Sequence, residues 1–201
     1  MTEDAASHAE KMKAQQAEHR RKTREAQDPG RGLVLVHTGN GKGKSSSAFG
    51  VIARALGWGK QVGVVQFIKG KWITGERRFF ERFQDEVHWY TMGDGFTWDT
   101  QDKNADTAAA VAAFERAEAM LKSGDYDLIV LDEINIALRY DYLDAERVRA
   151  GLEGRSERTS VILTGRDAPP LLCDYADLVS EMGEVKHPYK AGIKAQKGID
   201  F

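Results

Sequence analysis

The sequence predicts an α/β protein, in which helices cover both faces of a doubly wound, mostly parallel sheet. A helical arm precedes this domain at the N-terminus. Short runs rich in β-branched and aliphatic residues alternate with segments of helical pattern along most of the chain. Runs such as LIVLD and VGVVQF are apolar throughout, which is typical of strands buried on both faces of a parallel sheet. A sheet of this kind presents its ligands at the carboxyl ends of its strands.

The chain changes character at the segment DPGRG, residues 28–32. Residues 1–31 form a polar arm that is rich in good helix formers and has almost nothing to bury. Such an arm either stays a solvated tail or becomes ordered against a partner or ligand. Residues 32–201 contain the alternating runs, so we expect them to form one α/β domain.

The expected elements of this domain follow from the positions of the runs. Strands are expected at Leu33–His37, Val62–Phe67, Val87–Thr91, Leu128–Asp132, Ser160–Thr164 and Leu178–Glu181. Helices are expected at Lys44–Leu56, Gly75–Phe83, Asn104–Leu121 and Asp144–Leu152. The last stretch, VKHPYKAGIKAQKGIDF, has no clear period, and its residues alone leave its role open.

Composition excludes several classes of protein. The formal net charge of −2 offers no global attraction for nucleic acid or for an anionic membrane. A single cysteine, Cys173, can form neither an intramolecular disulfide nor a cysteine-rich metal site. No run approaches the ~20 apolar residues of a membrane span, and residues 1–27 lack the pattern of an export signal. We therefore expect a cytoplasmic protein that binds neither nucleic acid nor membrane.

The segment LVLVHTGNGKGKSSSAFG joins a buried strand to a helix through a glycine-rich turn. Gly39, Gly41 and Gly43 let backbone N–H groups turn inward around an anion, and the helix N-terminus adds partial positive charge. Lys44 can reach phosphate oxygens and the Ser45 hydroxyl can bind Mg²⁺, as in the G-x-x-x-x-G-K-[ST] phosphate loop. The segment therefore predicts phosphate binding.

One position of this loop departs from the general pattern, because Thr38 stands where the first glycine is expected. The alternative interpretation is a glycine-rich turn without a ligand. That alternative leaves Lys42 unexplained, since a solvated lysine gains nothing from a position inside such a turn. The residues that we predict to bind the phosphates are Thr38, Gly39, Asn40, Gly41, Lys42, Gly43, Lys44, Ser45 and Ser46.

An acidic pair, Asp132 and Glu133, follows the buried run LIVL. The end of a buried strand is where phosphate-loop proteins hold their metal ion, directly or through water. Mg²⁺ prefers oxygen ligands and keeps several waters, so Ser45, one carboxylate and phosphate oxygens would suffice. Both acidic residues are candidates for that carboxylate, and the alternative role for the pair is to cap the next helix. The loop and the pair together predict a site for a nucleotide with Mg²⁺.

Six segments between about Gly32 and Phe201 can be compared with known families, and they include the loop and the acidic pair. They are TGNGKGKSS, VGVVQFIKG, GFTWDTQ, LIVLDEIN, VILTGR and VKHPYKAGIKAQKGIDF. In this order they resemble the P-loop class of cob(I)alamin adenosyltransferases. A phosphate loop alone would match countless proteins, whereas GFTW followed by the AGIKAQKGIDF stretch is far more specific. The resemblance implies a P-loop NTPase fold of RecA-like type, and Thr38 matches the family.

The resemblance implies an enzyme that transfers the 5′-deoxyadenosyl group of ATP to Co(I) of a corrinoid and releases triphosphate. The loop would hold ATP in the reverse sense, with the γ-phosphate where an ordinary P-loop holds the α-phosphate. Loop N–H groups, Lys42, Lys44 and Mg²⁺ would stabilise the charge of the leaving triphosphate. The alternative functions are an ATPase or kinase that acts at the γ-phosphate, and a nucleotide-sensing module without chemistry.

The same resemblance gives roles to residues outside the loop. Phe96 and Trp98 of GFTW would form an apolar wedge below the corrin ring, which leaves cobalt four-coordinate and easier to reduce; otherwise they are core aromatics. Arg54 and Arg166 are secondary candidates for ATP contacts, or else surface or ion-pair arginines. The catalytic residues that we predict are Lys44, Phe96, Trp98 and Glu133.

The resemblance also implies a homodimer, a reduced flavoprotein as the electron donor, and an arm that closes over the corrinoid. Gln66 and Lys69 lie at the end of an expected strand, where such a sheet presents ligands, but their contacts do not follow from the sequence. The cobalt-binding motif Asp-x-His-x-x-Gly of other cobalamin proteins is absent. We therefore expect structural or surface roles for His37, His88 and His187.

Overall fold

The computed structural model describes residues 3–68, 74–91 and 103–200, in two units, Met1–Gly30 and Arg31–Phe201. The first unit contains helix α1 (Glu3–Glu25), which agrees with the expected helical arm. Within this helix Arg21 pairs with Glu18 and with Glu25, each at 2.8 Å between nitrogen and oxygen. Pairs at this spacing support a helix that has little apolar surface of its own.

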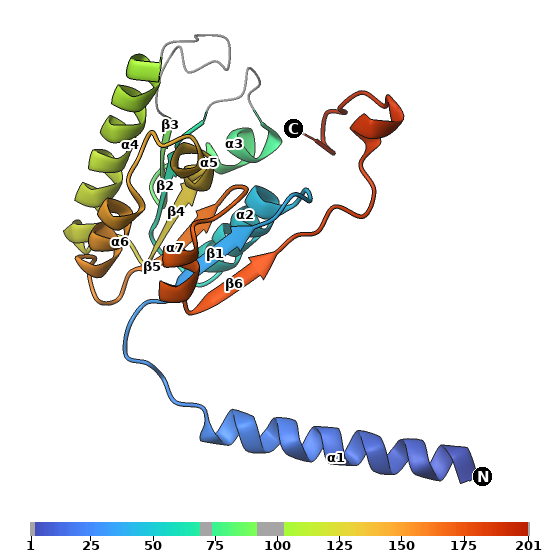
Figure 1. The fold of residues 1–201 in the computed structure, drawn as a ribbon. Helices are drawn as coiled ribbons and strands as arrows, with labels where there is room; N and C mark the ends of the chain where they lie inside the picture. Colours follow the sequence, from blue (N-terminus) through green and yellow to red (C-terminus); the bar gives the residue numbers. More distant parts are fainter. Residues whose placement is uncertain (1–2, 69–73, 92–102, 201) are drawn as a thin grey trace. The chain divides into compact units, whose positions relative to one another are not determined.

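Among the described residues of the second unit, six parallel strands form one sheet in the order β3-β2-β4-β5-β1-β6 (Figure 1). The strands are β1 (Val34–Thr38), β2 (Val62–Gln66), β3 (Val87–Thr91), β4 (Leu128–Asp132), β5 (Ser160–Thr164) and β6 (Leu178–Glu181). Side chains of the central strands alternate between two buried clusters, one on each face of the sheet. The predicted doubly wound α/β fold is therefore confirmed.

Helices cover both faces of this sheet (Figure 1). The helices are α2 (Lys44–Leu56), α3 (Gly75–Phe80), α4 (Lys103–Ser123), α5 (Ile134–Arg139), α6 (Ala145–Glu153), α7 (Pro170–Tyr175) and the 3₁₀ helix η1 (Pro188–Ala191). One buried cluster combines strand residues with α2 and α3, and the other combines them with α4 to α7. None of the helices in the described residues is long and apolar enough to cross a membrane.

The helices differ from the sequence prediction in their bounds and in their number, and the ends of α4 and α6 lie one or two residues from the predicted ones. α3 ends at Phe80 rather than at Phe83, because the backbone N–H groups of Arg82 and Phe83 bond three residues back, to Phe79 O (3.2 Å) and Phe80 O (2.9 Å), as in a 3₁₀ turn. Helices α5, α7 and η1 were not predicted. Each has six residues or fewer, which is too short to display a helical period in the sequence.

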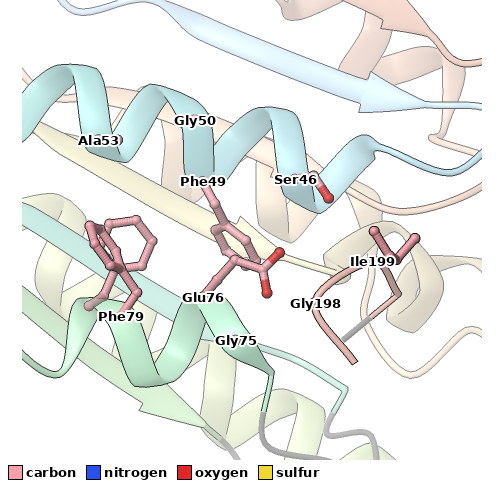
Figure 2. A pocket seen from close by; sticks show the side chains of 10 residues that line it. Ser46, Phe49, Gly50, Ala53, Gly75, Glu76, Phe79, Gly198 and Ile199 are labelled. Atoms are coloured by element: carbon pink, nitrogen blue, oxygen red, sulfur yellow. The ribbon is translucent and has the colours of Figure 1, made fainter. Parts of the chain in front are cut away.

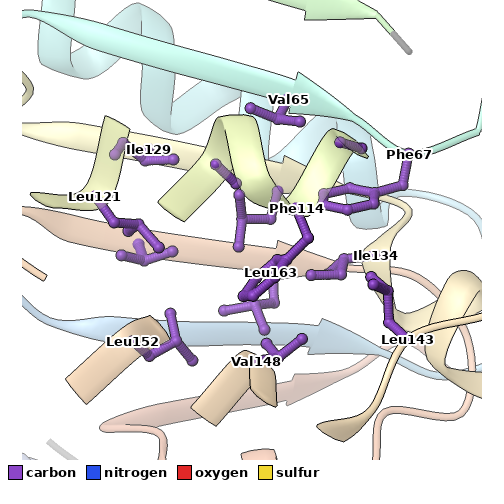
Figure 3. Close-up of a cluster of buried hydrophobic side chains, with 14 of the residues drawn as sticks. Val65, Phe67, Phe114, Leu121, Ile129, Ile134, Leu143, Val148, Leu152 and Leu163 are labelled. Carbon is purple, nitrogen blue, oxygen red and sulfur yellow. The ribbon is translucent and has the colours of Figure 1, made fainter. Parts of the chain in front are cut away.

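Phe114 of α4 lies at the centre of the larger cluster and is fully buried (Figure 3). Gly151 of α6 faces its ring, and a Cβ atom at that position would lie 2.9 Å from Phe114 Cζ. The glycine thus allows α6 to approach the aromatic ring closely, and the ring fills the space between α4, α6 and the sheet.

We expect Phe114→Ala to lower the free energy of unfolding by about 3–5 kcal/mol, because it leaves a cavity among side chains that cannot collapse fully. Urea denaturation followed by circular dichroism would measure this loss. Leu178→Ala is the control, since Leu178 is 44% exposed on the edge strand β6 and should cost far less. Equal losses for the two variants would contradict this description of the core.

Candidate functional site

The glycine-rich loop lies between β1 and α2, at the carboxyl end of the sheet. Gly39 (φ 93°) and Gly43 (φ 113°) adopt left-handed backbone conformations that residues with a Cβ atom rarely adopt. At Gly41 the constraint is space, because a Cβ atom would lie 2.6 Å from the carbonyl oxygen of Gly183. No side chain caps the N-terminus of α2. The first backbone N–H groups of this helix therefore point toward the loop without a side-chain acceptor.

Two lysines bring positive charge to this loop in different ways. Lys44 is only 6% exposed, and its Nζ donates to the carbonyl oxygen of Gly41 at 2.6 Å. Burial lowers the pKa of Lys44, and the nearby charge of Arg166 acts in the same direction. The side chain of Lys42 is 49% exposed, and its Nζ lies 2.6 Å from a carboxylate oxygen of Asp200. One lysine is therefore fixed inside the loop, and the other lies on its surface.

Asp132 ends β4 and is 2% exposed. Two side chains hydrogen-bond to its carboxylate: Gln66 Nε2 donates at 3.0 Å and Thr164 Oγ1 donates at 2.8 Å. Ser45 lies close enough to lower the pKa of this carboxyl group as well. Burial raises the pKa of Asp132, and these hydrogen bonds oppose the rise because they favour the ionised form. The carboxylate is therefore held in one position beside the first turn of α2.

Glu133 follows directly and has a left-handed backbone with φ of 59°, a conformation uncommon outside glycine. Its backbone N–H donates to Thr164 Oγ1 at 2.9 Å, which stabilises the turn into α5. Burial and the neighbouring charge of Asp132 raise the pKa of Glu133 to about 7, while Lys44 and Arg166 act in the opposite direction. The carboxyl group of Glu133 therefore lies within the electrostatic field of the loop.

The oxygen atoms of this site suit Mg²⁺. The Ser45 hydroxyl lies close enough to the Asp132 carboxylate to lower its pKa, so one cation could contact both groups, with Glu133 adjacent. The residues that the structure describes contain no group of three or more His, Cys, Asp or Glu side chains that could hold a metal ion. A cation here would need water and phosphate oxygens as well, which is the coordination that Mg²⁺ usually retains.

The segment after β5 hydrogen-bonds to the glycine-rich loop at two points. Thr38 Oγ1 accepts the backbone N–H of Ala168 at 3.1 Å, and Arg166 donates to the carbonyl oxygen of Asn40 at 3.4 Å. A hydroxyl at Thr38 thus makes a bond that glycine could not make, which gives a structural reason for this departure from the general phosphate-loop pattern. No local sequence signal pointed to Ala168, because its contribution is a backbone group.

The structure brings most, though not all, of the predicted residues together. Ser46 is exposed in the first turn of α2, next to Ser45. Arg54 lies in the last turn of α2, ten residues after Lys44, and is therefore about 15 Å from it along the helix axis. Phe96, Trp98 and Lys69 lie outside the described residues.

A groove of about 400 Å³ begins beside the loop and runs between α2, α3 and residues 198–199 (Figure 2). Ser46 lies at its loop end, and the rings of Phe49 and Phe79 and the carboxylate of Glu76 line it. Sequence reasoning missed this groove, because its walls come from three segments that are far apart along the chain.

Comparison with known proteins decides the family. Residues 30–201 match the family model described as ATP:corrinoid adenosyltransferase BtuR/CobO/CobP. The chain belongs to this family. The resemblance that the sequence motifs indicated is therefore confirmed.

The relatives match over nearly their whole length. A corrinoid adenosyltransferase of Pseudomonas aeruginosa is 54% identical over 194 residues, which cover 96% of this chain and 95% of that protein. A corrinoid adenosyltransferase of Sinorhizobium sp is 48% identical, with coverage of 98% and 93%. Corrinoid adenosyltransferase CobA of Salmonella typhimurium is 49% identical, with coverage of 85% and 86%.

We expect Glu133→Gln to stabilise the protein at pH 8. The folded pKa of about 7 lies above the ordinary 4.5, so the fold favours the protonated carboxyl, and stability is lost as pH rises from about 4.5 through 7. The amide avoids this loss, and its advantage at pH 8 should be on the order of 1–3 kcal/mol. Urea denaturation at pH 4, 6 and 8 would measure it. A stability difference that does not change with pH would contradict this assignment.

Proposed function

We propose that this chain transfers the 5′-deoxyadenosyl group of ATP to Co(I) of a corrinoid and releases intact triphosphate. The observation that carries the proposal is family membership over residues 30–201, with relatives named corrinoid adenosyltransferases that are about half identical over nearly the full chain. The glycine-rich loop, its two lysines and the strand-end carboxylates support it, because together they fit a triphosphate.

In this reaction Co(I) of the substrate attacks ribose C5′, the C5′–O bond breaks, and its electron pair passes to the triphosphate. The nucleophile has no proton to lose, so no general base is required. Catalysis requires that the negative charge on the leaving triphosphate be stabilised. Lys42, Lys44 and the loop N–H groups provide this stabilisation. Lys44 is already fixed and largely removed from water, so it needs little rearrangement when that charge develops.

The remaining site residues extend this assignment. Ser45 and Asp132 would hold Mg²⁺, with Glu133 as the adjacent carboxylate; when bound, the ion would add positive charge against the triphosphate. Asp132 is favoured over Glu133 for the direct role, because Gln66 and Thr164 fix its carboxylate at the end of β4 beside Ser45. Arg166 reaches the loop at Asn40 and is assigned to ATP, whereas Arg54 lies too far along α2 to act at the loop within one chain.

The direct test is anaerobic incubation of the protein with ATP, Mg²⁺ and chemically reduced corrinoid, followed by absorption spectroscopy. A new light-sensitive spectrum of a Co–C bond is expected, and omission of ATP is the control. If that spectrum does not form under conditions in which the Pseudomonas aeruginosa relative is active, the proposed function is wrong.

Two substitutions separate binding of the triphosphate from reduction of cobalt. Lys44→Ala should lower the transfer rate by about 10²-fold or more even when Co(I) is supplied, because the charge on the leaving group loses a cation that is fixed inside the loop. Trp98→Ala should impair mainly the assay that starts from Co(II), because we assign Phe96 and Trp98 to the wedge below the corrin ring. Initial rates in the two assays measure this difference. Equal losses of rate for Trp98→Ala in both assays would show that Trp98 does not act in the reduction of cobalt.

The polar arm, residues 1–31, is proposed as a lid that excludes water from the corrinoid site of a homodimer, with a reduced flavoprotein as the electron donor. Helix α1 supports this, since a polar helix with little to bury suits a segment that docks only when substrate is present. Deletion of Met1–Asp28 should reduce corrinoid turnover several-fold while the affinity for ATP, measured by calorimetry, stays unchanged. Unchanged corrinoid turnover would show that the arm does not act as a lid.

A further inference from the structure

The segment that follows β6, residues 182–200, has no part in the proposed reaction, yet it begins and ends at the phosphate loop. Met182 N donates to the carbonyl oxygen of Thr38 at 2.9 Å, and Gly41 N donates to the carbonyl oxygen of Met182 at 2.7 Å. The segment then passes through η1 and returns, so that Asp200 meets Lys42. We call residues 182–200 the post-β6 segment.

The return contact is an oriented ion pair. The distance from Lys42 Nζ to Asp200 Oδ1 is 2.6 Å, and the other carboxylate oxygen accepts the backbone N–H of Gln196 at 2.9 Å. The bond from Lys42 holds the pKa of Asp200 below its usual range, and the nearby His187 acts in the same direction. Asp200 is therefore an ionised carboxylate at neutral pH, and the backbone of its own segment points it at the loop.

The residues next to Asp200 hold this end of the segment only lightly. Gly198 and Ile199 form one wall of the groove, opposite Ser46 and Phe49 of α2 (Figure 2). Ile199 is nevertheless 80% exposed, so the contact buries little apolar surface. Ile199 therefore adds little to the free-energy cost of moving this end of the segment away from the loop, and the Lys42–Asp200 pair is the main contact to be broken.

Lys42 is the loop lysine that remains accessible to an incoming anion. Lys44 is buried and bonded to the carbonyl oxygen of Gly41, whereas half of the Lys42 side chain is exposed. Carboxylate and phosphate oxygens are both anionic acceptors that form charge-assisted hydrogen bonds with an ammonium group. Asp200 and a bound triphosphate therefore require the same group of Lys42.

We propose that Asp200 competes with triphosphate for Lys42, both when ATP binds and when the product leaves. The proposal rests on the proposed function, because it assumes that the loop binds a triphosphate. Binding of the triphosphate displaces Asp200 from Lys42. The return of Asp200 after adenosyl transfer replaces the product at Lys42 and speeds its release, so the post-β6 segment limits how tightly the loop holds its product.

The test is the affinity of the full chain for inorganic tripolyphosphate, measured by isothermal titration calorimetry. Asp200→Asn preserves the size of the side chain and removes its charge, and should raise the affinity about two- to fivefold, the range expected for one ion pair whose lysine is half exposed. Asp85→Asn makes the same change of charge at an exposed position two residues before β3, at the opposite end of the sheet, and should leave the affinity unchanged.

A second comparison shows whether the effect passes through Lys42. In a Lys42→Ala background, Asp200→Asn should no longer change the affinity, because the shared ammonium group is gone. Equal affinities of the unaltered chain and Asp200→Asn, or the same gain in both backgrounds, would overturn the competition. If the unaltered chain does not bind tripolyphosphate at all, the proposed function fails and the competition fails with it.

Discussion

The site depends on one buried carboxylate. Asp132 lies at the end of a fully buried strand, where an unpaired charge would strongly destabilise the fold. Gln66 of β2 and Thr164 of β5 hydrogen-bond to it, and Ser45 of α2 lies close enough to lower its pKa. Because the two bonding partners belong to different strands, satisfying this one group fixes the ends of β2 and β5 relative to the end of β4, beside the start of α2. The glycine-rich loop directly precedes α2 and therefore lies beside the same carboxylate.

The sheet order explains how the two halves of the site are held together. β5 lies between β1, which leads into the loop, and β4, which ends at Asp132. Thr164 at the end of β5 donates to Asp132 and accepts from the backbone of Glu133. After β5, the backbone of Ala168 bonds to Thr38 at the start of the loop. β5 thus connects the acidic end of β4 with the glycine-rich loop after β1, because β4 and β1 do not pair directly.

Much of this could be predicted from the sequence, and the physical reason is burial. Strands that are buried on both faces are continuous apolar runs, so β4 and β5 were predicted with their observed bounds. Lys44 and Asp132 follow from a loop pattern and a strand end, which are local features. The partners Gln66 of Asp132 and Asp200 of Lys42 are not local, because they depend on strand order and on the path of a segment without a period.

The proposed function places the broken bond between C5′ and the triphosphate, so the loop and its lysines would stabilise a leaving triphosphate rather than a transferred phosphoryl group. Phosphorus NMR of an anaerobic reaction with ATP, Mg²⁺ and Co(I) corrinoid resolves the two outcomes. The account predicts intact triphosphate in an amount equal to the Co–C bonds formed. Formation of ADP and inorganic phosphate in place of triphosphate would contradict it.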